Sequence, residues 1–288
     1  MKHSLGSLPV HLRELNKKLS PYNIYDDTIL RLLLHQRLLD VTQIDSLCRL
    51  RYWLFVVVLD NFRIIQDIHP ACADTTIETN ISVINNTYSD YAKARSHSFD
   101  EFGINQYYFS ANKVDIFSAA LSSVSSSKYT WNQDVLYIGA RTEGELFYFS
   151  TKGFDINRIK CIDLYSYSSF IDLGDMHNIP HPSCNFDTVL LTHSITYSED
   201  PGLVFSEAFR VLRPGGILFI SISLDKSVTK TKKSLDAERP RTGAISALSM
   251  EGYVKLFQSL NLSGKYITTL AYKSNPSMSI SLFRKSIA

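Results

Sequence analysis

Four segments of this sequence place residues suited to ligand binding at the end of a short apolar run or in a polar loop. The glycine-rich stretch from Gly139 to Glu145 directly follows the run DVLYI. Without a Cβ the backbone there can approach a ligand closely, and a helix that begins at such a turn offers free N–H groups. Asp163 ends the run RIKCID, and Asp175 lies in the loop GDMHNIP. A carboxylate can accept hydrogen bonds from two donors at once.

His193 follows the apolar run FDTVLL and is the clearest candidate for a general base. An imidazole ordinarily titrates near pH ~6.5, so it can take up a proton at neutral pH. A zinc site built from His177, His181, Cys184 and His193 is not expected. Pro180 and Pro182 keep His177 and His181 off one regular helix face, and no ligand spacing typical of zinc follows.

The elements that position these residues alternate between short apolar runs and helix-length segments from Trp131 onward. The runs are DVLYI, RIKCIDL, FDTVLL and GILFISI. Between the last two, Val204, Ala208 and either Val211 or Leu212 fall on one face of a helix that stops at PGG. We predict an α/β fold: a Rossmann-like doubly wound sheet, mostly parallel with an antiparallel last strand. Such sheets bind ligands at the carboxyl ends of their strands.

This order of elements resembles class I, S-adenosylmethionine-dependent methyltransferases of the small-molecule type, similar to methyltransferase type 11. RVLRPGGILFI is the most specific match, and GDMHNIPHPSCNFDTVLL resembles the segment that joins the adenine-contacting acid to the fourth strand. The resemblance covers about residues 131–288. It implies a cofactor-binding methyltransferase domain at 129–288, and residues 1–128 are predicted to form a mainly helical N-terminal extension that caps the substrate region.

The resemblance also implies roles for individual residues. Asp163 would accept hydrogen bonds from the ribose hydroxyls, Asp175 would pair with the adenine amino group, and Met176 would pack on the adenine ring. Only twelve positions separate the two acids, so the usual intervening helix is expected to be replaced by the loop YSYSSFIDLG. The residues expected to hold S-adenosylmethionine, or S-adenosylhomocysteine as product, are Gly139, Ala140, Arg141, Gly144, Asp163, Leu164, Asp175, Met176, His177 and His193.

The glycine turn departs from the family pattern at two positions. Tyr137 stands where family members usually have an acid, and Arg141 stands where they usually have a second glycine. The Arg141 side chain would have to turn away from the methionine carboxylate or pair with it, and a guanidinium is well suited to such pairing. These departures leave open a protein that has lost cofactor binding and serves as a scaffold.

Methyl transfer requires mainly that a nucleophile be held in line with the sulfonium methyl group, and sometimes a base. His193 is the candidate catalytic base, although the same position can contribute only backbone to the cofactor site. Aromatic and cationic side chains could hold an anionic or aromatic substrate. The candidates for that role are Tyr91, Arg95, His97 and Tyr197. The first three also fit a solvated helical face.

Composition narrows the function further. The chain of 288 residues has a formal net charge of +2, which favours neither nucleic acid nor an acidic membrane as a partner. Sequence patterns of a hydrolase elbow, a phosphate loop or an HExxH metalloprotease are missing.

Nothing resembles a signal peptide or a membrane span, so we expect a soluble cytoplasmic protein. The apolar N-terminal helices could cover the core or form a homodimer.

These patterns together predict a biosynthetic transferase that moves a methyl group from S-adenosylmethionine to an oxygen or nitrogen atom of a small molecule or natural-product intermediate. An RNA or protein methyltransferase is the enzymatic alternative, and the basic run at 226–241 is its only support. The scaffold protein is the non-catalytic alternative.

Overall fold

The computed structural model describes residues 132–140, 143–164, 170–223, 248–272 and 275–287, together with residues 31, 32, 34–36, 43 and 47. Most of the predicted N-terminal extension, including Tyr91, Arg95 and His97, therefore lies outside the described residues. Arg141 and the basic run at 226–241 also lie outside them.

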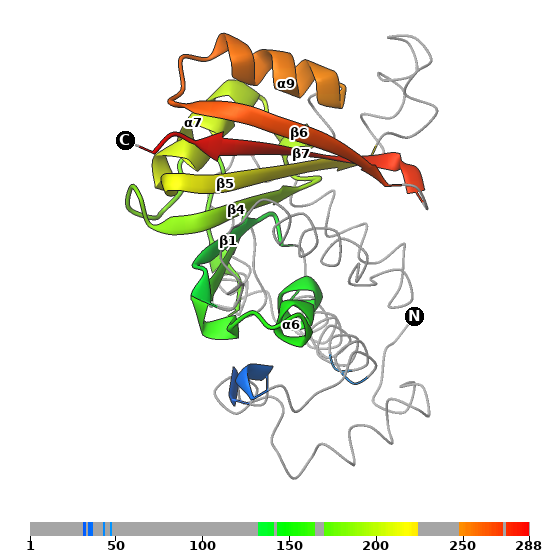
Figure 1. The fold of residues 1–288 in the computed structure, drawn as a ribbon. Helices are drawn as coiled ribbons and strands as arrows, with labels where there is room; N and C mark the ends of the chain where they lie inside the picture. The colour runs from blue at the N-terminus through cyan, green and yellow to red at the C-terminus, as the bar shows by residue number, and fades with distance from the viewer. Residues whose placement is uncertain are drawn as a thin grey trace, which may run out of the picture.

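The described part of the chain is built on one sheet of seven strands in the order β3-β2-β1-β4-β5-β7-β6 (Figure 1). The strands are β1 (Val135–Ile138), β2 (Ile159–Asp163), β3 (Asp172–Leu173), β4 (Phe186–Thr192), β5 (Leu212–Ser223), β6 (Gly264–Tyr272) and β7 (Asn275–Lys285). Strands β1 to β5 pair in parallel. Strand β7 runs antiparallel to both β5 and β6. The predicted Rossmann-like sheet with an antiparallel last strand is thus confirmed.

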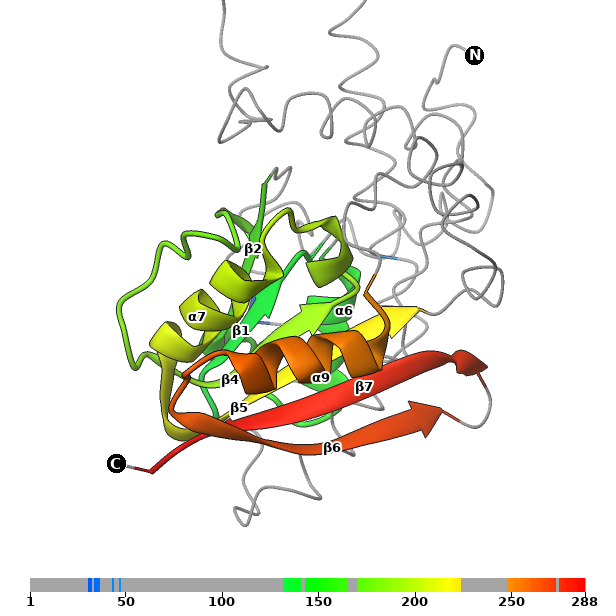
Figure 2. The same ribbon diagram turned by 90° about the horizontal axis from the view of Figure 1, so that it is seen from above.

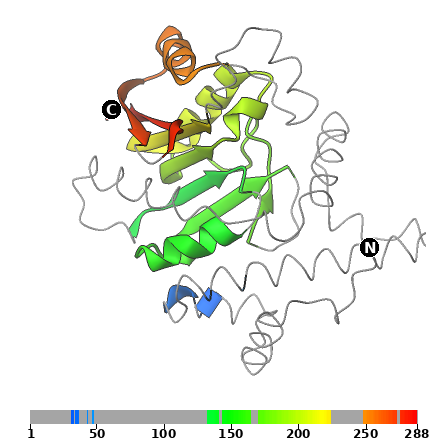
Figure 3. The same cartoon turned by 90° about the vertical axis from the view of Figure 1, so that its right-hand side faces the viewer.

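Helices cover both faces of this sheet, as its doubly wound topology requires (Figures 2 and 3). They are α6 (Gly144–Thr151), α7 (Pro201–Val211) and α9 (Met250–Ser259), with the short 3-10 helices η8 (Ile156–Arg158) and η9 (Ile195–Tyr197). Helices α7 and α9 share one hydrophobic cluster with Leu136 and Ile138 of β1. Tyr137, between those two residues, contacts Phe149 of α6 instead, because neighbouring strand residues point to opposite faces.

Helix α7 shows clearly why the sequence folds as it does. Asp200 caps its start by accepting a hydrogen bond from the Leu203 N–H at 3.0 Å, and Pro201 occupies the first turn, where no backbone donor is needed. The Lys285 ammonium of β7 donates to the carbonyl oxygens of Phe209 at 2.6 Å and Leu212 at 2.7 Å, which lie at the helix end. The cap and the lysine thus fix both ends of the helix against the sheet.

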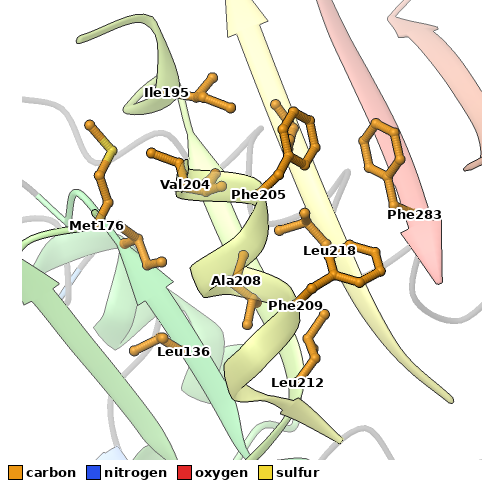
Figure 4. Packing of buried hydrophobic residues seen from close by; sticks show 14 of the residues in the cluster. Leu136, Met176, Ile195, Val204, Phe205, Ala208, Phe209, Leu212, Leu218 and Phe283 are labelled. Atoms are coloured by element: carbon orange, nitrogen blue, oxygen red, sulfur yellow. The ribbon is translucent and has the colours of Figure 1, made fainter. Parts of the chain in front are cut away.

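The apolar face of α7 forms the centre of the core. Val204, Ala208 and Val211, three of the residues predicted to face the sheet, are fully buried. Phe205 and Phe209 widen this face and contact Phe257 of α9, while Phe205 also meets Phe283 of β7 (Figure 4). The hydrophobic spacing read from the sequence therefore identifies the packed face correctly.

The segment between Asp163 and Asp175 retains a short third strand. The two residues of β3 pair with Ile162 and Asp163 of β2. Residues 165–169, where the expected loop begins, lie outside the described part. Among the residues that the structure describes, no helix is long and apolar enough to cross a membrane.

Candidate functional site

Backbone and side-chain hydrogen bonds tie the carboxyl ends of four neighbouring strands together. The Gly139 N–H, after β1, donates to the Ile162 carbonyl of β2 at 2.8 Å. The Gly174 N–H, after β3, donates to the Asp163 carbonyl at 3.0 Å. The Ser194 hydroxyl, after β4, donates to the Ile138 carbonyl of β1 at 2.9 Å. The glycine turn, both predicted acids and the His193 turn therefore meet at one edge of the sheet, where open α/β sheets bind ligands.

The turn after β1 is shaped so closely that only glycine fits its first position. Gly139 has a φ of +80°, a conformation that L side chains rarely adopt. A Cβ at this position would lie 2.5 Å from the Ser194 Cβ. Ala140 is buried, and Gly144 begins α6. The missing side chain at Gly139 therefore lets this turn pack directly against Ser194 of the turn after β4.

Glu143 immediately before α6 is a buried carboxylate that the sequence did not single out. Its side chain is 0% exposed, although a charged group so deep in a protein must be compensated by its surroundings. Sequence alone gave no signal for it, since a glutamate in a glycine-rich turn is usually solvated. Its position at the helix start adds a polar group to this edge of the sheet.

Asp163 ends β2 with its side chain only 5% exposed. A solvated strand end would leave a carboxylate open to water, so this burial separates Asp163 from an ordinary surface acid. Leu164, which follows it, is half-buried. The structure thus places both residues at the predicted edge, and their contact with a ribose stays a prediction.

Asp175 is held by the residue two positions further on. The Asp175 Oδ1 accepts hydrogen bonds from the His177 backbone N–H at 2.8 Å and from the His177 Nδ1 at 2.7 Å. Burial on its own would raise the pKa of Asp175, but these contacts outweigh it and place the pKa below the ordinary value of 3.8. Asp175 is therefore ionised at neutral pH and can only accept hydrogen bonds.

The loop that carries Asp175 is fastened to α7. The Glu207 carboxylate accepts a hydrogen bond from the Ile179 N–H at 2.9 Å. Arg210 donates to the carbonyl oxygens of Ile179 at 2.9 Å and His181 at 2.8 Å, and it also pairs with Glu207. The Met176 side chain is buried in the hydrophobic cluster beside α7 (Figure 4). Met176 thus anchors the loop, and its predicted contact with an adenine ring stays a prediction.

His193 adopts a backbone conformation that is unusual for a residue other than glycine. Its φ is +59°, and its N–H donates to the Ser221 carbonyl of β5 at 2.8 Å. The Thr196 hydroxyl donates to the His193 carbonyl at 2.8 Å. Such local strain is concentrated at functional sites in many proteins. Its role as a base stays a prediction, as does substrate contact by Tyr197, which lies half-buried in η9.

Tyr137, one of the two departures from the family pattern, packs beneath this edge and reaches the end of β4. Its ring is buried between the sheet and α6, and its hydroxyl forms a hydrogen bond with the Thr192 hydroxyl on β4. Tyr137 therefore links β1 and α6 to the last residue of β4, directly before His193. Among the described residues, no three His, Cys, Asp or Glu side chains are grouped so that they could hold a metal ion.

Comparisons with known proteins agree with this geometry. Residues 150–220 match the family model described as a methyltransferase domain. No curated protein matches the chain.

Solved structures with a similar fold include several methyltransferases. An S-adenosylmethionine-dependent methyltransferase from Mesorhizobium loti is 12% identical, with a TM-score of 0.46 over 60% of this chain and 100% of that one. One from Methanosarcina mazei is 14% identical, with a TM-score of 0.44 over 59% and 98% of the two chains. One from Thermotoga maritima, described as a possible histamine N-methyltransferase, is 14% identical, with a TM-score of 0.43 over 69% and 98%.

The family match includes the end of α6, strands β2 to β4, helix α7 and most of β5. It therefore spans Asp163, Asp175 and His193, three of the residues that the sequence predicted for this edge. Residues 150–220 are thus similar to a methyltransferase domain, and they form the greater part of the parallel half of the sheet.

Proposed function

We propose that this protein binds S-adenosylmethionine at the carboxyl edge of β1 to β4 and transfers its methyl group to an oxygen or nitrogen atom of a small molecule. The observation that carries the proposal is the buried Asp163 carboxylate beside the glycine turn, tied through Gly174 to the loop of Asp175. Two acids at one edge of the sheet suit an adenosine, since ribose hydroxyls and the adenine amino group are hydrogen-bond donors.

Each residue has a distinct part in this proposal. The backbone of Gly139, Ala140 and Gly144 approaches the methionine part of the cofactor, where the start of α6 favours a carboxylate. Asp163 binds the ribose, and Asp175 binds the adenine amino group. The protein supplies mainly orientation, because the sulfonium methyl group is already activated for transfer to a nucleophile held in line.

The test is calorimetric titration of the protein with S-adenosylmethionine and S-adenosylhomocysteine. Wild type is expected to bind both. Asp163→Asn should bind about 10- to 150-fold more weakly, the value of one or two hydrogen bonds to a charged group. Asp172→Asn is the matched control, because that carboxylate is exposed on the neighbouring strand and should not affect binding. If folded wild type binds neither ligand, the scaffold alternative replaces this proposal.

His193 is the proposed general base. His193→Asn removes the base while retaining a residue that tolerates positive φ. With an acceptor found by screening small molecules for uptake of labelled methyl groups, kcat should fall by about 10²- to 10⁴-fold. The affinity for S-adenosylhomocysteine should change little. An unchanged kcat would mean that the turn supplies only backbone to the cofactor.

A further inference from the structure

The His177 side chain connects two segments of the candidate site that are far apart in sequence. Its Nδ1 lies 2.7 Å from the Asp175 Oδ1, and its Nε2 lies 2.8 Å from the Ser198 Oγ, which follows η9. The His177 side chain is 11% exposed, and Ser198 is 1% exposed. The imidazole is therefore fixed at both nitrogen atoms in a nearly water-free environment.

The chemistry of the partners determines the direction of both hydrogen bonds. The ionised Asp175 carboxylate has no proton to donate, so the Nδ1 of His177 carries the hydrogen. In a neutral imidazole the Nε2 is then an acceptor, and the Ser198 hydroxyl donates to it. Ser198 thus selects the tautomer that serves Asp175, in the way that outer ligands orient histidines elsewhere.

This arrangement uses only one oxygen atom of Asp175. Oδ1 takes both hydrogen bonds from His177, whereas Oδ2 makes no hydrogen bond to any residue that the structure describes. The Asp175 side chain is 19% exposed, so a ligand can reach it. A carboxylate held at one oxygen by two N–H groups cannot rotate freely, and its second oxygen has a fixed direction.

We propose that His177 is a positioning residue that makes the site selective for adenine over hypoxanthine. The proposal rests on the proposed cofactor site. The oriented Oδ2 of Asp175 accepts a hydrogen bond from the exocyclic amino group of adenine. Hypoxanthine has a carbonyl oxygen at that position, which cannot donate a hydrogen bond. The hydrogen bond to Asp175 is then lost, and the bound ligand leaves the Asp175 charge without a donor.

The same three residues do not form a hydrolytic triad, although the sequence of contacts from acid to imidazole to hydroxyl is similar. A nucleophilic serine must reach a substrate carbonyl, and Ser198 is almost completely buried. Orientation of the acid is the function that fits this burial.

The experiment compares S-adenosylhomocysteine with S-inosylhomocysteine, its hypoxanthine counterpart, by calorimetric titration of the full chain. The amide nitrogen of an asparagine lies near the position of the histidine Nδ1, and that of a glutamine lies near the Nε2. His177→Asn therefore keeps a donor to Asp175, while His177→Gln keeps only a group near Ser198. Wild type should prefer the adenine ligand by at least tenfold, the value of one well-placed hydrogen bond.

The ratio of the two affinities, adenine ligand over hypoxanthine ligand, should stay near the wild-type value in His177→Asn. It should fall toward one in His177→Gln. His177→Ala, which removes both contacts, should behave like the glutamine variant, and it keeps the test valid if that variant does not fold. An equal loss of affinity for both ligands in every variant would overturn the inference and leave His177 as a simple structural link. A preference retained by His177→Gln would overturn it too. Wild type that binds neither ligand would instead refute the proposed function, and this inference with it.

Discussion

At the scale of single residues, the site depends on two backbone conformations that few side chains allow. Gly139 after β1 and His193 after β4 both have positive φ. The Ser194 side chain, which directly follows His193, packs against Gly139. The Ser194 hydroxyl bonds the end of β1 at the same time. The glycine turn and the histidine turn therefore hold one another in place.

Gly139→Ala should disturb this contact. The new methyl group would lie 2.5 Å from the Ser194 Cβ, so one of the two turns must shift. We expect a loss of about 1–2 kcal/mol in the free energy of unfolding from the positive φ alone. The affinity for S-adenosylhomocysteine should fall by about 10- to 100-fold, as expected for a displacement near 1 Å. Urea unfolding and calorimetry measure the two effects.

Gly215→Ala is the control that separates the loss of stability in Gly139→Ala from its loss of affinity for S-adenosylhomocysteine. Gly215 has nearly the same φ, +79°, but its Cβ would lie 3.5 Å from the nearest side-chain atom, which is an ordinary contact. It lies near the start of β5, at the opposite edge of the sheet. Its alanine variant should lose stability and retain the cofactor affinity. Equal affinity in both variants would mean that the Gly139 turn does not touch the cofactor.

The sequence predicted individual site residues where an apolar run ends and a polar residue follows. Asp163 and His193 could be found in this way, because the end of a buried strand places the next side chain at the ligand-binding edge. The link from His177 to Ser198 could not be found, since 21 positions and the whole of β4 separate the two residues. Glu143 was missed because no pattern distinguishes a buried glutamate from a solvated one.

At the scale of elements, α7 both packs the core and holds the loop that carries Asp175. Its buried face points to the sheet, while Glu207 and Arg210 bind the backbone of residues 179 and 181. The hydrogen bond from Arg210 is the main reason that the pKa of Glu207 lies below its ordinary value of 4.5. A pKa lowered by folding means that the ionised form stabilises the folded state.

Glu207→Gln should therefore lower stability in a pH-dependent way. The contribution of the carboxylate is present above its unfolded pKa and disappears as the pH falls through its lower folded pKa. At pH 7 we expect a loss of about 0.5–1.5 kcal/mol in the free energy of unfolding. In urea unfolding the gap between variant and wild type should close as the solution is acidified. A gap that is independent of pH would contradict this account of α7.

Glu251→Gln is the matched control for that measurement. Glu251 pairs with Lys255 one turn further along α9, but both side chains are largely exposed, at 75% and 71%. Solvent weakens such a pair, so the substitution should leave stability unchanged at every pH. A loss like that of Glu207→Gln would show that any carboxylate removal destabilises this protein.

Elements with a strong periodic pattern were predictable, and elements set by tertiary contacts were not. Helix α7 follows from its apolar spacing, although it ends at Val211, before the predicted stop at PGG, which lies within β5. Strand β3 contains only two residues, whose pairing with β2 defines it, and such a short segment has no periodicity to detect. The order of strands within the sheet was not predicted, because hydrophobic spacing does not encode it.

At the scale of the whole molecule, one aromatic group joins α7, α9 and β7. The Phe283 ring of β7 lies 4.6 Å from the Phe257 ring and 5.4 Å from the Phe205 ring, measured between centroids. Because Phe283 also pairs in register with Leu218 of β5, it connects the antiparallel edge of the sheet to its parallel half. Stability of the site thus depends on residues far from it.

Phe283→Ala should be strongly destabilising. The side chain is fully buried, and removal of such a ring costs about 3–5 kcal/mol when its cavity is not refilled. Leu203→Ala on α7 is the control, since that side chain is 44% exposed and its loss should change stability by less than about 0.5 kcal/mol. Urea unfolding measures both. A small effect of Phe283→Ala would mean that α9 and β7 do not fold cooperatively with the rest.

The most direct test of the account is a crystal structure of the protein with S-adenosylhomocysteine. We expect the ligand at the carboxyl edge of β1 to β4, with the ribose hydroxyls within about 3 Å of the Asp163 carboxylate and the adenine amino group at the same distance from Asp175. The homocysteine carboxylate should face the turn after Gly139. A ligand bound elsewhere, or an adenosine that touches neither acid, would contradict the assignment of this edge as the cofactor site.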